Sequence, residues 1–179
     1  MGRITLGTVM ADGNDIKREM LQDFAEAYRA FGLSKLMGRV VALLIYSAEP
    51  LSLDEIASEL EMSKGPISQI TRRLRDRNLI RRVWRPGSRK DYYEIMPTVF
   101  ENAFRNNLDL IHHNTEIAAN LKKLAASSPD PAMETLQQRL ILMEDFYKLM
   151  ETHFQNFLKA WAEEGSPLKV RDSENGGKS

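Results

Sequence analysis

Ten basic side chains lie between positions 64 and 90 of this 179-residue chain, and Asp76 is the one acidic residue among them. The whole chain carries 25 basic and 25 acidic residues, so this excess is local. Guanidinium and ammonium groups pair with phosphates, and a guanidinium can also form two hydrogen bonds with guanine. The pattern is the electrostatic signature of a nucleic-acid-binding surface. The basic residues are Lys64, Arg72, Arg73, Arg75, Arg77, Arg81, Arg82, Arg85, Arg89 and Lys90.

Two short helices are expected to position the first of these side chains. Residues 52–55, Ser-Leu-Asp-Glu, form a capping-box motif that starts a helix. Glu61 and Met62 provide a turn, after which Ser63 caps a second helix. Asn78 is a suitable left-handed residue at the end of that helix.

Two strands are expected to follow the second helix. Residues 79–85 and 90–96 are rich in Val, Ile, Trp and Tyr, and residues 86–88, Pro-Gly-Ser, favour a turn. Helix, turn, helix and hairpin in this order predict a winged helix-turn-helix.

The second helix should expose one face to DNA. Core spacing predicts that Ile67, Ile70, Thr71 and Leu74 are buried. Gln69 can form two hydrogen bonds with adenine, and Arg72 can do so with guanine. Ser63, Ser68 and the first-turn amides suit a phosphate, because helix N-termini attract anions. The predicted exposed face consists of Lys64, Gly65, Ser68, Gln69, Arg72 and Arg73.

The hairpin adds Arg85, Arg89 and Lys90 around its tip, where they could reach phosphates or a minor groove. Two other interpretations stay open at this point. A charged helix and hairpin can be a solvated surface, and winged helices also serve as protein-docking modules. The near absence of acidic residues in this stretch favours DNA binding.

Three stretches of the chain resemble the MarR superfamily, in particular its GbsR-like branch of repressors. They are GRVVALLIYSAEPLSLDEIASEL, SKGPISQITRRLRDRNLIRRVW and GSRKDYYEI. The resemblance implies a homodimer, a recognition helix that begins near Ser63, and Arg89 as the arginine at the wing tip. Family members commonly place an Asp just before that arginine, whereas this chain has Gly87 and Ser88.

Helical periodicity continues on both sides of this region. Residues 14–30 and 34–47 are expected to form helices before it, and residues 99–126 a long helix after it. Residues 127–131 contain two prolines and break the pattern. The last helix carries an apolar seam with steps of three and four, which predicts a dimerisation arm. The seam consists of Met133, Leu136, Leu140, Met143, Tyr147, Met150, Phe154, Phe157 and Trp161.

Aromatic side chains of this helix raise the question of a small-molecule effector. Tyr147, Phe154 and Trp161 could surround an organic cation, because aromatic faces attract cations. Packing in a core or in a dimer interface is the simpler explanation of the same residues.

Several functions are disfavoured by what the sequence lacks. It has no cysteine, no phosphate-binding glycine loop and no catalytic motif, so we expect neither an enzyme nor a cofactor. His112 and Glu116 share a helical face but His113 does not, so no metal site is expected. The longest apolar run, residues 40–46, is too short to span a membrane. With no secretory signal expected either, the predicted location is the cytoplasm, at the nucleoid.

The predicted fold is therefore mainly α with a small β wing. The expected parts are a mobile N-terminus (1–13), a winged helix-turn-helix with an N-terminal helix (14–97), a helical dimerisation region (98–164) and a disordered tail (165–179). The predicted function is a homodimeric regulator, most simply a repressor, that binds an inverted-repeat operator in double-stranded DNA and can respond to a small effector. The alternative is a winged-helix adaptor that docks a protein and does not bind DNA.

Overall fold

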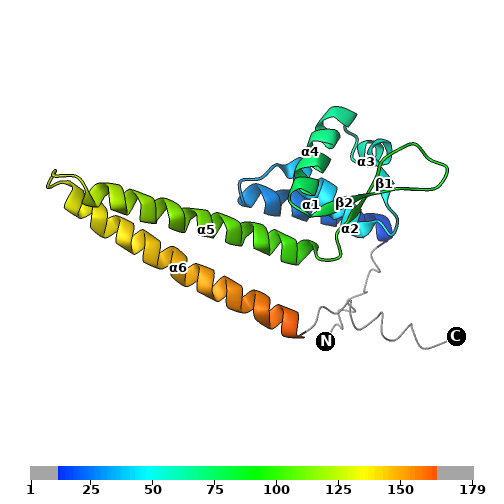
Figure 1. Cartoon of the computed structure of the whole chain (residues 1–179). Helices are drawn as coiled ribbons and strands as arrows, with labels where there is room; N and C mark the ends of the chain where they lie inside the picture. The colour runs from blue at the N-terminus through cyan, green and yellow to red at the C-terminus, as the bar shows by residue number, and fades with distance from the viewer. Residues whose placement is uncertain (1–11, 165–179) are drawn as a thin grey trace, which may run out of the picture. The chain divides into compact units, whose positions relative to one another are not determined.

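The structure is a computed structural model that describes residues 12–164, and it is mainly α-helical with one small antiparallel sheet (Figure 1). The chain divides into two compact units, one that ends at Val99 and one that begins at Phe100. The elements are α1 (Gly13–Ala30), α2 (Lys35–Tyr46), β1 (Leu51–Ser52), α3 (Leu53–Glu59), α4 (Lys64–Asp76), β2 (Ile80–Val83), β3 (Tyr92–Ile95), α5 (Val99–Ala126) and α6 (Met133–Glu164).

The predicted helix starts of the first unit are confirmed at two caps. The Ser34 hydroxyl accepts a hydrogen bond from the Met37 amide at the start of α2. At the start of α3, Ser52 and Glu55 form the complete capping box. Ser63 occupies the N-cap position of α4, but its side chain makes no capping hydrogen bond. The hydroxyl of Ser63 is therefore not committed to its own helix.

The turns around α4 depend on left-handed residues. Asn78 has φ of 56° directly after the helix, as predicted. Glu61 has φ of 53° in the turn between α3 and α4, a position where a small residue or Asn is more usual. Together these two residues set where α4 begins and ends.

The core of the first unit is built around α2. Val40, Val41, Leu43 and Leu44 are almost completely buried. A Cβ added to Gly38 would lie 2.2 Å from the carbonyl oxygen of Phe24, so α1 and α2 can cross this closely only because position 38 has no side chain. On its other sides α2 packs against α4 and β3.

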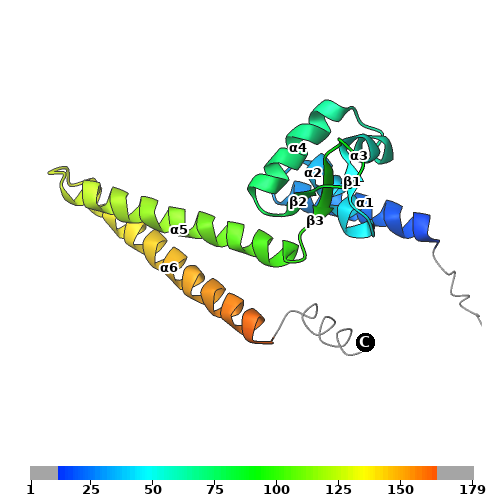
Figure 2. The same ribbon diagram turned by 45° about the vertical axis from the view of Figure 1, so that its right-hand side comes forward.

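The sheet differs from the prediction in two ways. Its order is β1-β3-β2, and β1 is a third strand that pairs Leu51 with Tyr93 (Figure 2). β1 is only two residues long, which is too short to give an alternating pattern in the sequence. The strands expected over residues 79–85 and 90–96 are shorter than predicted, because pairing runs only from Ile80–Ile95 to Val83–Tyr92. The rest of the wing is loop.

The second unit is an antiparallel hairpin of α5 and α6, which lie side by side in both ribbon views (Figures 1 and 2). At one end Phe104 stacks against Phe154 with ring centroids 4.5 Å apart. Near the other end Lys122 pairs with the buried Glu144. No helix among the described residues is long and apolar enough to cross a membrane.

The predicted apolar seam of α6 is divided between two environments. Leu140 is buried, and Phe154 and Phe157 pack against Phe104 of α5 in the same chain. Part of the seam is therefore covered within the hairpin, where the sequence suggested a second chain. The neighbouring stripe remains open, since Leu142, Phe146 and Leu149 are 70%, 59% and 60% exposed.

The predicted mobile and disordered ends fall largely outside the described residues. Within them, α1 begins one residue before the predicted start, with Asp12 at its N-cap position and Gly13 as its first residue. The Gly13 carbonyl accepts a hydrogen bond of 3.0 Å from the Tyr46 hydroxyl. Residues 165–179 lie outside the described range.

Candidate nucleic-acid interface

The helix α4 has the two faces that its sequence predicts. Ile67, Ile70, Thr71 and Leu74 are buried, and the Thr71 hydroxyl donates to the carbonyl of Ser68 at 3.1 Å. All the side chains predicted to face DNA are exposed. They are Ser63, Lys64, Gly65, Ser68, Gln69, Arg72 and Arg73.

The exposed face is also open for close approach. A Cβ added to Gly65 would meet nothing within 4 Å. Gly65 and Ser68 are small, so the backbone of the first helical turn is accessible beside Gln69. A groove of DNA could therefore approach this end of α4 closely.

Apart from Lys64, the basic residues of α4 have no acidic partner among the described residues. Arg72, Arg73 and Arg75 form no ion pair with any other described residue, and neither does Arg89 in the wing. Asp76 follows on the same helix without pairing with them. These guanidinium groups are available to an anionic partner.

The charges of the wing are largely neutralised, which the sequence did not indicate. Acidic residues outside the basic stretch fold against it. The pairs are Lys64–Asp54, Lys90–Asp54, Arg85–Glu49, Arg82–Asp91 and Arg81–Glu94. The free positive charge of this surface is therefore smaller than the sequence suggests, and most of it lies on α4.

The predicted wing residues are placed differently from one another. Arg85 donates to Glu49 at 2.8 Å and lies over the Tyr92 ring, 4.8 Å from its centroid, so it is held against the sheet. Arg89 is exposed in the loop between β2 and β3. Trp84 is 74% exposed just after β2.

Lys64, Arg89 and Lys90 line one cleft, of about 330 Å³, between the start of α3, the start of α4 and the wing. Asp54 lies in the same cleft. Hydrogen bonds from Lys64 and Lys90 lower the pKa of Asp54, and the bond to Asp54 raises the pKa of Lys90. Sequence reasoning missed Asp54, because it stands 36 positions before Lys90 and outside the basic stretch.

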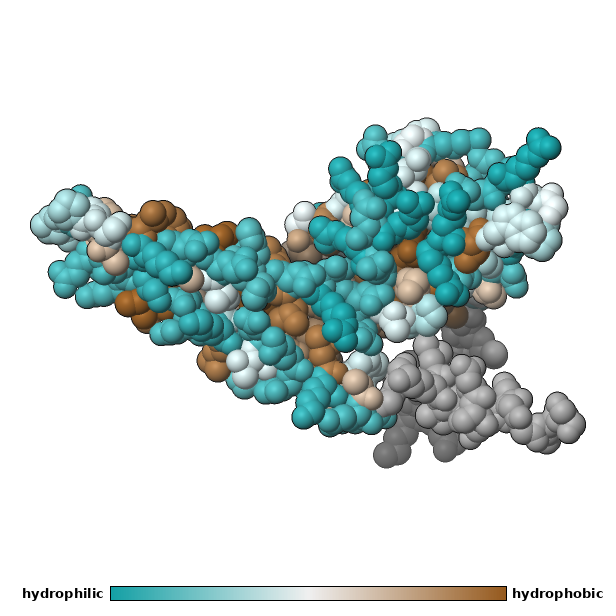
Figure 3. Space-filling model, viewed as in Figure 1, coloured by the Kyte–Doolittle hydropathy of each residue, from teal (hydrophilic) through white to brown (hydrophobic). Residues whose placement is uncertain are grey.

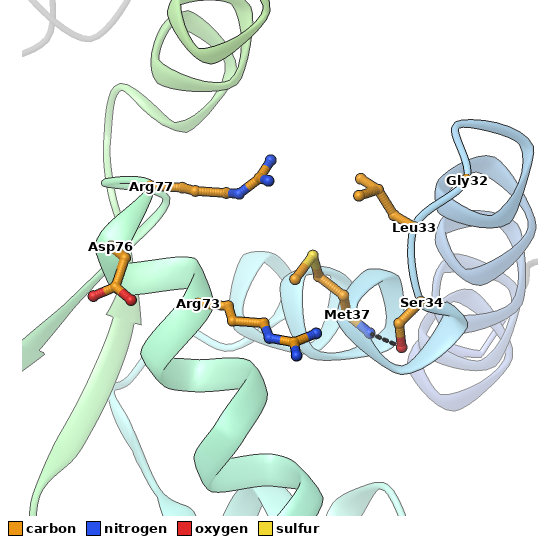
Figure 4. Close-up of a pocket in the computed structure, with 7 residues that line it drawn as sticks. All are labelled: Gly32, Leu33, Ser34, Met37, Arg73, Asp76 and Arg77. Atoms are coloured by element: carbon orange, nitrogen blue, oxygen red, sulfur yellow. Dashed lines mark hydrogen bonds between the residues drawn. The ribbon is translucent and has the colours of Figure 1, made fainter. Parts of the chain in front are cut away.

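Arg73 follows Arg72 in α4 and is therefore turned by about 100° around the helix axis from it. Arg73 of α4 and Arg77 just after it extend across a cavity of about 400 Å³ toward the loop between α1 and α2, and Met37 also lines this cavity (Figure 4). Asp76 also lines this cavity. Arg73 thus lies on the flank of the helix, and Gln69 and Arg72 form the centre of the exposed face.

The three predicted effector residues do not surround a single cavity. Trp161 lines an apolar cavity of about 360 Å³ together with Phe100, Phe104 and Phe157. Phe154 stacks on Phe104, and Tyr147 packs edge-on against Phe146. Of the three, only Trp161 lines the cavity.

The histidines of α5 lie close to glutamates. His112 lies 3.3 Å from Glu151 and 3.4 Å from Glu116, both measured between ring nitrogen and carboxylate oxygen. Among residues 12–164 there is no group of three or more His, Asp or Glu side chains arranged to hold a metal ion.

Comparison with known proteins agrees with this geometry. The family model described as "MarR family" matches residues 40–92. The Bacillus subtilis protein YvaV is 35% identical over 75 residues, 42% of this chain and 42% of YvaV. The HTH-type transcriptional repressor OpcR of the same organism is 30% identical over 79 residues, 44% of this chain and 43% of OpcR. The matches thus span less than half of each relative's length.

The fold is similar to a solved structure over a longer range. The crystal structure of a transcriptional regulator superposes with a TM-score of 0.70 and 24% identity, over 83% of this chain and 99% of that one. At this identity the likeness concerns the fold alone. The helix-turn-helix and most of the wing lie within residues 40–92, so the segment that matches the MarR family model folds as a winged helix-turn-helix.

Proposed function

We propose that this protein is a transcriptional regulator that binds specific sequences of double-stranded DNA as a homodimer. One observation carries the proposal. α4 exposes Gln69 and Arg72 on the face opposite its buried residues, and no acidic side chain within residues 12–164 pairs with Arg72. A long side chain with two parallel donors on such a face is suited to the edge of a base in the major groove.

The contacts divide by chemistry. Gln69 and Arg72 would select bases, with adenine and guanine as their respective partners. Ser63, Lys64, Ser68, Arg89 and Lys90 would hold phosphates, with Gly65 allowing close approach. Arg85 and Arg73 would not select bases, because Arg85 is held by Glu49 and Arg73 lies on the flank of α4. They would contribute mainly by the attraction of their charge to the phosphate backbone.

Dimerisation would use the α5–α6 hairpin. Apolar side chains remain exposed along it, and brown surface is visible there among the hydrophilic residues (Figure 3). Exposed apolar patches of this kind commonly mark association surfaces. Two-fold symmetry would then place two copies of α4 in successive major grooves of an inverted repeat.

Repression is the simplest mode of action, since a dimer bound over a promoter blocks transcription without further contacts. The resemblance of the three quoted stretches to the GbsR-like branch of repressors supports this mode of action. The site of action would be the cytoplasm, at the nucleoid. The apolar cavity beside Trp161 is a candidate site for an effector that changes DNA affinity by preferring one shape of the dimer.

Selection of bound fragments from sheared genomic DNA tests the main proposal. We expect enrichment of an inverted repeat, and an affinity that falls steeply between about 50 and 200 mM salt. A protein-docking adaptor would give no enriched sequence and no salt-dependent binding. That outcome would overturn the proposal in favour of the alternative.

A further inference from the structure

Asp54 lies where two of the proposed phosphate ligands meet. Its Oδ1 atom accepts from Lys64 Nζ at 2.5 Å, and its Oδ2 atom accepts from Lys90 Nζ at 3.0 Å. Lys64 is the first residue of α4, and Lys90 lies in the loop between β2 and β3. One carboxylate therefore links the proposed recognition helix to the wing.

The surroundings of this carboxylate suit an exchange of anions. The cleft that contains it is open, and the Asp54 side chain is 39% exposed. Lys64, Arg89 and Lys90 supply three positive charges around the cleft, against Asp54 and Asp91. A phosphate offers the same kind of charged acceptor as a carboxylate, and ammonium groups bind either one as point charges.

The location of Asp54 in α3 holds it in this place. It is the second residue of a helix whose capping box is complete, and a negative charge in the first turn is stabilised by the helix dipole. Glu55 is turned back to the Ser52 amide, so it does not compete for the lysines. In the part of the chain that the structure describes, Asp54 is the one carboxylate that pairs with both Lys64 and Lys90.

We propose that Asp54 occupies, in the DNA-free protein, the place that a backbone phosphate takes in the complex. This inference rests on the proposed DNA-binding function. Each contact between a phosphate and Lys64 or Lys90 would first have to release that lysine from Asp54. Asp54 would therefore act as an internal competitor that limits adhesion to DNA of any sequence, while base selection by Gln69 and Arg72 is left unchanged.

The test is the substitution Asp54→Asn, measured by fluorescence anisotropy on the selected operator and on a scrambled duplex between 50 and 200 mM salt. We expect tighter binding to both duplexes, by about threefold or more at low salt, and a salt slope steeper by about one unit per protomer, as for one added phosphate contact. Asp15→Asn is the matched control. It makes the same change of charge but removes an exposed pair with Arg18 on α1, so binding should stay as in the unaltered protein.

Two results would overturn the inference. Weaker binding by Asp54→Asn would make Asp54 only a structural tie between α3, α4 and the wing, and unchanged binding would mean that Asp54 does not compete. The double variant Lys64→Gln, Lys90→Gln adds a second check, because Asp54→Asn should have no effect in that background. Persistence of the effect there would equally overturn the assignment.

The result also separates this inference from the proposed function. If the unaltered protein binds no DNA at any salt concentration, the proposed function itself fails. If it binds and Asp54→Asn does not tighten binding, only the role of Asp54 fails. Circular dichroism confirms folding of the variant, and Asp54→Ser, which also suits a helix first turn, replaces it if Asn does not fold.

Discussion

Two kinds of cationic side chain coexist in the winged unit. Arg72 and Arg89 have no acidic partner among the described residues, whereas Arg85 and Lys90 each have one. An unpaired cation meets DNA without first losing a contact, while a paired one exchanges one anion for another. The two kinds should therefore differ in their effect on affinity and on its salt dependence.

Arg72→Ala should reduce operator affinity by about 1–3 kcal/mol and relax base preference at one position in each half-site. The reason is the loss of two donors at a base edge, on the face of α4 opposite its core. Affinities for operator and scrambled duplex are compared. Arg75→Ala, an exposed and unpaired arginine on the same helix, is the control and should weaken both duplexes alike. An equal loss on both duplexes for Arg72→Ala would reduce it to a phosphate contact.

Arg89→Gln should weaken binding to every sequence and flatten the salt slope by about one unit per protomer. Arg89 is unpaired and exposed in the wing loop, and its charge therefore acts on the phosphate backbone. The slope of log affinity against log salt measures this. Arg82→Gln, where Asp91 already neutralises the arginine, should change the slope less. If Arg89→Gln leaves the slope unchanged, the wing does not contact DNA.

At the scale of the elements, close packing and buried charge fix how helices meet. α1 and α2 cross where Gly38 leaves no room for a side chain. α5 and α6 are joined by Glu144, which is buried on α6 and paired with Lys122 on α5 and Lys148 on its own helix. Each contact gives a stability prediction with a matched control.

Gly38→Ala should destabilise the winged unit by about 1–3 kcal/mol, because overpacking forces α1 away from α2. The added Cβ would lie 2.2 Å from the Phe24 carbonyl oxygen and 2.7 Å from its carbon. Gly65→Ala is the same substitution at a helical position with open space, and should stabilise by up to about 1 kcal/mol through helix propensity. Urea unfolding of both variants measures the difference. Equal stability of the two would contradict the close crossing.

Glu144→Gln should lower the urea midpoint for unfolding of the α5–α6 hairpin at pH 7. It should also reduce the loss of stability that the hairpin suffers at acid pH. Hydrogen bonds from Lys122 and Lys148 lower the pKa of Glu144 from 4.5 to about 2. A lowered pKa stabilises the folded state above about pH 4.5, and this contribution is lost as the pH falls from there toward about 2. The midpoints of the variant and the unaltered protein should therefore converge between those values.

Glu163→Gln is the control for this series, because Glu163 is exposed on the same helix and lies 3.9 Å from Lys159. It should leave both the midpoint and its pH dependence close to those of the unaltered protein. A constant gap between Glu144→Gln and the unaltered protein from pH 7 to pH 2 would show that the charge of Glu144 is not what stabilises the hairpin.

At the scale of the whole molecule, the α5–α6 hairpin leaves many apolar side chains exposed. Leu142, Phe146 and Leu149 recur on one exposed stripe of α6, and Leu110, Leu121 and Leu124 are exposed on α5. Exposing so much apolar surface on a monomer is unfavourable. In the proposed homodimer, a second copy of the chain would cover this surface and supply the second recognition helix that an inverted repeat needs.

Phe146→Glu should convert a dimer of about 41 kDa, twice the 20.5 kDa chain, into monomers at micromolar concentration. A charge on the exposed stripe would be buried without a partner in the dimer but stays hydrated in the monomer. Light scattering measures the mass, and Asn120→Glu, an exposed polar position on α5, should leave the dimer intact. Operator half-sites should be about 10 base pairs apart or a multiple of that distance. A monomeric unaltered protein would refute the dimer.

The sequence by itself determined the elements of this protein, because their signals are local. The capping box at Ser52, the left-handed Asn78 and the core spacing of α4 each involve residues a few positions apart, and the structure has them as predicted. The bounds of α5 were also predictable, since prolines stop the periodic pattern after it. The two-residue β1 could not be predicted, because its only signal is pairing with a strand some 40 positions later.

Only the tertiary structure decided which charges are paired and which apolar side chains remain exposed. Asp54 and Glu49 approach the wing from 36 positions away, so no window of sequence shows that they neutralise Lys90 and Arg85. Likewise the periodicity of α6 indicates that its apolar seam must be covered, but it does not indicate whether the same chain or a second chain covers it. α5 covers part of it in the same chain and leaves Phe146 exposed, because the antiparallel pairing buries only the face that meets Phe104 and Lys122.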